Sequence, residues 1–94
     1  MLFRSVELDA LHLAAVERSR AREALLLEVV EEARLTARLA RMQYIGGEAD
    51  LQWVIEAERR LIEAEDSSAI ARQERLEAAI DLFKAMGGSP MRDA

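Results

Sequence analysis

The chain has 94 residues, of which 51% are hydrophobic, 33% are charged, 4% are aromatic and none is cysteine. This length allows one domain, and the absence of cysteine excludes disulfides, thiolate zinc sites and cysteine nucleophiles. The formal net charge of −5 lacks the basic footprint of a nucleic-acid-binding protein. A composition rich in alanine, leucine, glutamate and arginine is typical of long helices and coiled coils. Because small cores need support, we expect self-association to provide it.

The first predicted helix covers about residues 6–45, a stretch without glycine or proline. Ser5 can serve as its N-cap, and Glu7 and Asp9 place negative charge near the positive end of the helix dipole. One apolar seam comprises Val16, Leu26, Val30, Ala33, Ala37, Ala40 and Tyr44, interrupted by Ser19 and Glu23. A second apolar side comprises Leu25, Leu35, Leu39 and Met42.

Glycine pairs mark the ends of the helices. Gly46-Gly47 predicts a turn at 46–47, and Gly87-Gly88 followed by Pro90 ends the second helix, because glycine tolerates the left-handed conformation that closes helices. The second helix is therefore predicted at about 48–86, with a tail at 87–94. A short connection makes the two helices antiparallel, so the predicted fold is an all-α, coiled-coil-like helical hairpin.

The second helix has two apolar seams. The first follows an alternating spacing of three and four residues that is typical of coiled coils, with alanine at every seventh position. It comprises Val54, Ala57, Leu61, Ala64, Ala71, Ala78, Leu82 and Ala85, with Ser68 and Arg75 as interruptions. The second seam, about 100° around the helix, comprises Leu51, Ile55, Ile62, Ala69, Leu76, Ile80 and Phe83.

A single hairpin buries one seam of each helix and leaves the other exposed. We therefore expect a homo-oligomer, in its simplest form two hairpins that make an antiparallel four-helix bundle, with a ring of hairpins as the larger alternative.

The sequence offers little for catalysis or metal binding. His12 is the only histidine and has Asp9 one turn before it, but bundle di-metal sites require two Glu-x-x-His motifs. The acidic cluster at 56–66 contains Arg59 and Arg60, which make ordinary helix-surface pairs with Glu56. We therefore expect no enzymatic activity, no metal and no cofactor.

Nothing in the sequence predicts a membrane span. No stretch approaches the ~20 apolar residues that cross a bilayer, and acidic residues occupy the positions where a secretory signal is apolar. The chain as written is expected to be soluble, without an export signal, and cytoplasmic if expressed alone.

Aromatic residues flank the predicted turn. Tyr44 and Trp53 either shield the last layer of the core or form a contact at the tip of the hairpin.

Three segments in order carry a family resemblance: Tyr44–Leu51 (YIGGEADL), Val54–Leu61 (VIEAERRL) and Leu82–Gly88 (LFKAMGG). Together they resemble the C-terminal helical hairpin of TolC-like outer-membrane efflux proteins. Trp53 departs from the pattern, because some members place an aspartate there, and the usual third glycine and tryptophan after the last segment are missing.

The resemblance implies that the hairpin is a wall element of a trimeric periplasmic tunnel. Its turn would lie at the periplasmic tip, where the channel closes at rest and an adaptor protein docks. Tyr44 would match the tip tyrosine, Gly47 the turn glycine and Glu56 an acidic residue that faces the aperture, while Asp50 and Trp53 would complete the tip or partner contact.

Two alternatives remain for the role of the chain. A 94-residue hairpin is not expected to form a pore by itself. It is either a fragment or truncated relative of an outer-membrane and periplasmic efflux protein, or a stand-alone soluble homo-oligomeric bundle that acts as a protein–protein interaction module.

Overall fold

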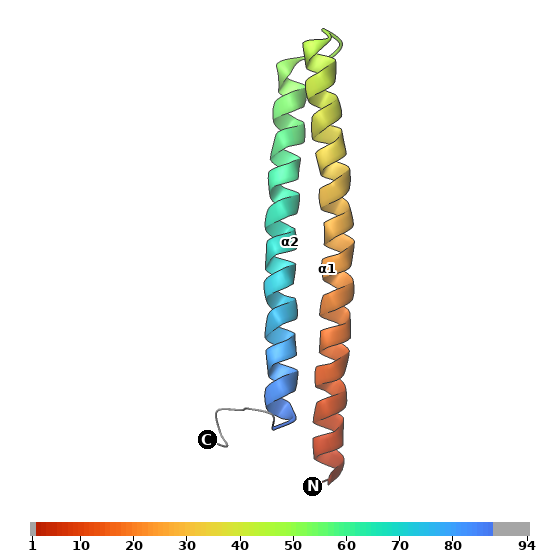
Figure 1. Cartoon of the computed structure of the whole chain (residues 1–94), viewed down its shortest axis with the longest axis vertical. Coiled ribbons are helices and arrows are strands. Elements are labelled where there is room, and N and C mark those ends of the chain that lie inside the picture. The colour runs from red at the N-terminus through yellow and green to blue at the C-terminus, as the bar shows by residue number, and fades with distance from the viewer. Residues whose placement is uncertain (1, 88–94) are drawn as a thin grey trace. The chain divides into compact units, whose positions relative to one another are not determined.

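The computed structural model describes residues 2–87, and side chains from Val6 onward. These residues form two helices, α1 (Leu2–Ile45) and α2 (Leu51–Ala85), joined by a turn (Figure 1). No strand occurs among them. The predicted all-α helical hairpin is therefore confirmed. Most of the predicted tail, residues 88–94, lies outside the described part of the chain.

The first helix starts earlier than its sequence predicts. α1 begins at Leu2, so Ser5 lies inside the helix and is not its N-cap. Leu2, Phe3 and Arg4 contain no helix breaker, and the helix extends through them because nothing in the chain stops it. With this start, Glu7 and Asp9 lie beyond the first turn of α1.

The turn is longer than two residues, and α2 starts at Leu51 rather than at 48. The backbone N–H of Trp53 donates to Asp50 Oδ1 at 3.0 Å, which is the hydrogen bond of an N-cap to the third residue of the helix. Asp50 thus sets the start of α2, and the chain from Gly46 to Asp50 forms the connection.

Replacing Asp50 by alanine should therefore lower the free energy of unfolding by about 1 kcal/mol, because one amide of the first turn loses its acceptor. Thermal unfolding followed by circular dichroism measures the change. Asp50→Asn is the matched control, since asparagine is an equally good N-cap without charge. Equal losses in both variants would mean that the charge of Asp50, and not its cap hydrogen bond, stabilises the helix.

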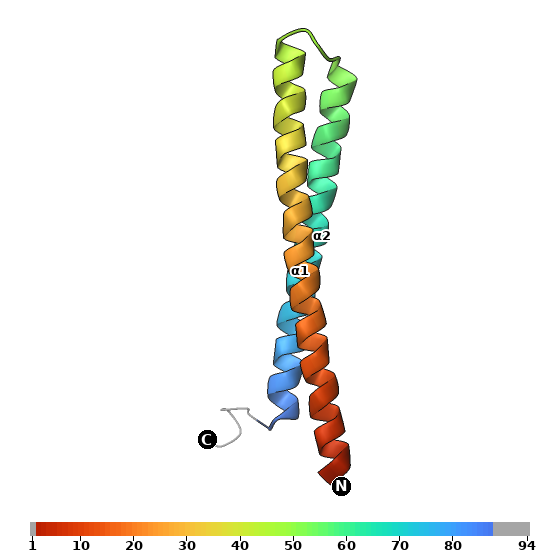
Figure 2. The same cartoon turned by 90° about the vertical axis from the view of Figure 1, so that its right-hand side faces the viewer.

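The structure divides into two compact units, each made of one segment from each helix. Unit 2 spans Ala24–Ile70 and includes the turn, and the segments next to the turn lie side by side in both views (Figures 1 and 2). Its core cluster consists of Ala37, Ala40 and Ala57, with Trp53, Val54 and Leu61 packed against it. Small side chains at the centre let the two backbones approach closely.

Unit 1 consists of the chain up to Glu23 and from Ala71 onward. Ala71 is buried, and the two segments are linked by ion pairs between Arg75 and Glu23 and between Arg22 and Glu74. The last two predicted members of the α2 seam differ in this unit. Leu82 is half-buried, whereas Ala85 is exposed and borders a shallow hollow.

The second apolar seam lies on the surface of the hairpin. Its large members in α2, namely Leu51, Ile55, Ile62, Leu76, Ile80 and Phe83, are 45–57% exposed. Leu25, Leu35, Leu39 and Met42 in α1 are 53–63% exposed. The hairpin by itself therefore buries only one apolar seam of each helix.

Candidate partner-contact site at the turn

Hydrogen bonds between backbone groups close the turn around the end of α1. Gly46 N–H donates to the carbonyl oxygen of Met42 at 3.0 Å, and the N–H groups of Glu48 and Ala49 both donate to the carbonyl oxygen of Gln43, at 2.7 and 3.2 Å. Gly47 has φ +78°, a left-handed conformation that side chains other than glycine rarely adopt. The backbone conformation at position 47 therefore favours glycine, as the glycine pair in the sequence indicates.

Trp53 closes the core at the turn end of unit 2. Its indole Nε1–H donates to Gln43 Oε1 at 3.3 Å, and its ring packs against the cluster of buried alanines. The ring is half-buried, so this arrangement corresponds to the shielding role considered for it from the sequence. Sequence reasoning missed Gln43, because a single polar residue next to a seam gives no signal of its partner on the other helix.

Tyr44 lies on the outside of the turn end. Its side chain is 46% exposed, although the spacing assigned it to the α1 seam, and the neighbouring Gln43 takes the inward position. Ile45, which sequence reasoning did not single out, is 83% exposed. The end of the hairpin therefore exposes one aromatic side chain and one branched apolar side chain.

Glu56 is held by two arginines of its own helix. Glu56 Oε1 accepts from Arg59 at 3.1 Å and lies 3.6 Å from Arg60. The hydrogen bond from Arg59, together with the charges of Arg59 and Arg60, lowers the pKa of Glu56 below its usual value. A lowered folded-state pKa stabilises the fold at pH values above the ordinary carboxyl pKa, and this contribution is lost as the pH falls. Glu56 is thus a paired carboxylate rather than a free acid.

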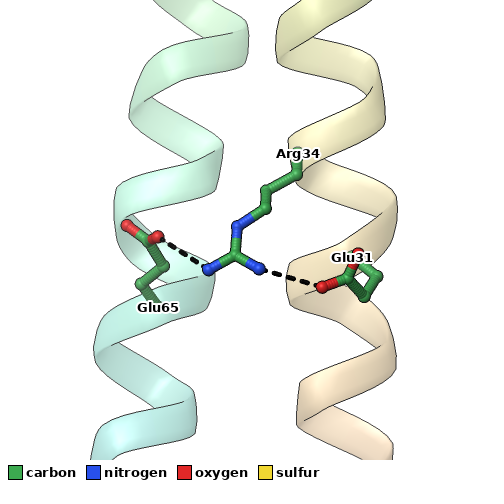
Figure 3. Close-up of polar contacts among 3 residues, drawn as sticks. All are labelled: Glu31, Arg34 and Glu65. Carbon is green, nitrogen blue, oxygen red and sulfur yellow. Dashed lines mark hydrogen bonds and ion pairs between the residues drawn. The ribbon is translucent and has the colours of Figure 1, made fainter.

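Cross-helix ion pairs connect one flank of unit 2. Arg34 lies between Glu31, 2.9 Å away on the same helix, and Glu65 on α2, 3.6 Å away (Figure 3). Seven residues nearer the turn on each helix, Arg41 of α1 donates a hydrogen bond to Glu58 of α2. All of these side chains are substantially exposed, and exposed pairs each contribute at most about 1 kcal/mol. They therefore add little to the stability of the hairpin.

His12 contacts the backbone of its own helix. His12 Nδ1 lies 2.7 Å from the carbonyl oxygen of Leu8 one turn earlier. Asp9, Asp81 and Lys84 border the same shallow hollow. Within residues 2–87 no three potential metal-ligating side chains converge. In the same range, neither helix contains a stretch with the length and apolar character that crossing a bilayer requires.

Comparison with known proteins gives one informative similarity. Over 65 residues, 69% of this chain, the sequence is 34% identical to the pyoverdine export outer membrane protein OpmQ of Pseudomonas putida. The chain is related to an outer-membrane efflux protein. This similarity covers only 14% of the length of OpmQ. No family model matches the chain, and no solved structure matches it significantly.

Proposed function

We propose that this chain is a non-enzymatic structural element equivalent to a tunnel-wall hairpin of a TolC-like outer-membrane efflux channel. The similarity to OpmQ supports the proposal, because it extends over most of the chain and concerns an outer membrane protein of pyoverdine export. The helical hairpin with a close-packed alanine core fits a wall element. Its exposed second seam fits a role in which neighbouring helices cover that seam.

The turn end is the proposed site of gating and partner contact. Tyr44 supplies an exposed ring there, whereas Gly47 and Asp50 shape the turn from which that ring projects. Trp53 supports the end from inside, through its hydrogen bond to Gln43. In this arrangement Tyr44 makes the contact with a partner, and the other residues of the tip hold the turn in a fixed conformation. Glu56 lies one turn further along α2, where its two arginine partners reduce its effective charge toward a channel opening.

Two kinds of partner follow from this role. Copies of the same or an equivalent hairpin would cover the second seam through apolar contact, and a periplasmic adaptor protein would meet the turn end. Nucleic acid is not proposed as a partner, because the net charge is −5.

A chimaera tests the wall role. The segment of OpmQ that aligns with this chain would be replaced by the corresponding residues of this chain, and outer-membrane accumulation and oligomeric state would be measured. We expect the chimaera to accumulate and assemble as OpmQ does, because the seams of the hairpin meet the same neighbours. A chimaera that folds in isolation from the membrane but never assembles would contradict the proposal.

The alternative role is a stand-alone homo-oligomeric bundle that acts as an interaction module. The exposed apolar side chains of both helices favour it, because they would also be covered by a second hairpin. This alternative requires the isolated chain to associate stably at micromolar concentration, which sedimentation measures. A monomeric chain would leave only the wall role.

A further inference from the structure

Two charged side chains face each other in the seam of unit 1. Arg75 Nε donates to Glu23 Oε1 at 2.5 Å, and these side chains are 28% and 16% exposed. The neighbouring pair in the same unit, Arg22 and Glu74, is 66% and 54% exposed and spans 3.7 Å. Charges that are withdrawn from water cost more when they lose their partner. The Glu23–Arg75 pair is therefore far more sensitive to misalignment of the helices than its surface neighbour.

The rest of the α2 seam gives little information about alignment. Its alanines recur at every seventh residue, at 57, 64, 71 and 78, and those at 57, 64 and 71 are buried. A slide of α2 by seven residues puts alanine where alanine was before. Apolar seams that repeat in this way do not strongly distinguish registers that differ by one heptad.

The charged pair does distinguish these registers. After a slide of seven residues in one direction Glu23 would face Ser68, and in the other direction it would face Leu82. Arg75 would correspondingly face Val16 or Val30. In both cases two partly buried charges would lose each other and face uncharged side chains in the seam, which costs more than the loss of an exposed pair.

We propose that the Glu23–Arg75 pair fixes the register of α1 against α2 in unit 1 and rejects packings shifted by one heptad. In unit 2 the turn sets the register locally, through Gly47 and the cap at Asp50. The turn that joins the two helices belongs to unit 2, and the charged pair is the corresponding device of unit 1. A single polar contact in an apolar seam is the best-attested way to specify coiled-coil alignment.

Cysteine cross-linking in the full chain tests this proposal, because the natural sequence contains no cysteine. Ser19→Cys with Ala78→Cys reports the native register, since these positions lie one turn further along the same seam from Glu23 and Arg75. Ser19→Cys with Ala71→Cys reports a shift of seven residues. With the charged pair intact, we expect intramolecular oxidation to favour the native reporter by about tenfold or more.

The E23L/R75L substitution removes the charges and keeps the seam apolar. In this background we expect the preference to fall to about threefold or less, with unchanged helical circular dichroism. The reversed pair E23R/R75E should restore the tenfold preference, and the exposed-pair control R22Q/E74Q should retain it. A tenfold preference that survives in E23L/R75L would overturn the proposal. Loss of helical signal in that variant would also overturn it, because the pair would then maintain the helices rather than their register.

Discussion

Replacing Ala71 by leucine should lower the free energy of unfolding by about 1–3 kcal/mol. Ala71 is 1% exposed in the seam of unit 1, where three additional carbon atoms have no space unless the helices move apart. Leucine has nearly the helix propensity of alanine, so the loss reports packing and not helix formation. For a domain of this size each kcal/mol corresponds to a shift of about 4–8 °C in Tm.

Ala69→Leu is the matched control for this prediction. It makes the same chemical change two residues earlier in α2, at a position that is exposed. We expect its free energy of unfolding to stay within about 0.5 kcal/mol of that of the unchanged chain. If the two variants had the same Tm, the alanines of the α2 seam would not be packed against α1 as described.

Replacing Ile62 by lysine should weaken self-association by about tenfold or more while leaving the hairpin folded. Ile62 is 57% exposed in the second seam, so it contributes little to the fold of the isolated hairpin. Burial of an isoleucine between copies is worth about 1.5–3 kcal/mol, and each 1.4 kcal/mol changes an association constant tenfold. Sedimentation velocity over a range of micromolar concentrations measures the shift.

Gln52→Lys controls for the charge that this substitution introduces. Gln52 is an exposed polar residue of α2 outside both seams, and its replacement by lysine adds the same charge. We expect association to be unchanged in this variant. Equal weakening by both substitutions would attribute the effect to net charge, and the second seam would then not be the contact surface.

The fold was largely predictable because its signals repeat along the chain. The seven-residue spacing of Ala57, Ala64 and Ala71 indicates a packed seam, and each of these residues is buried. The paired glycines indicate the turn, since a left-handed residue is needed there. Boundaries were predicted less well. The start of α2 depends on one hydrogen bond, from the backbone of Trp53 to Asp50, and such a bond leaves no periodic trace in the sequence.

Contacts between the helices could not be predicted from one helix at a time. Glu23 and Arg75 look like two unrelated interruptions of two seams, and only the register of the helices shows that they face each other. Gln43 and Trp53 are a second example, with their partnership set by the geometry of the turn. The same limit applies to the tip. Tyr44 fits the α1 seam by spacing, but Gln43 takes the inward position and leaves the tyrosine exposed.

The most direct test of the wall role is pyoverdine export by the OpmQ chimaera that carries this hairpin. Export would be measured in cells without native OpmQ and normalised to the amount of chimaera in the outer membrane. We expect export of the same order as that of OpmQ, and a severe loss when Ala71→Leu is introduced into the chimaera. Export no higher than in cells without OpmQ, from a chimaera present at normal levels in the outer membrane, would contradict the proposal that this chain is a channel-wall hairpin.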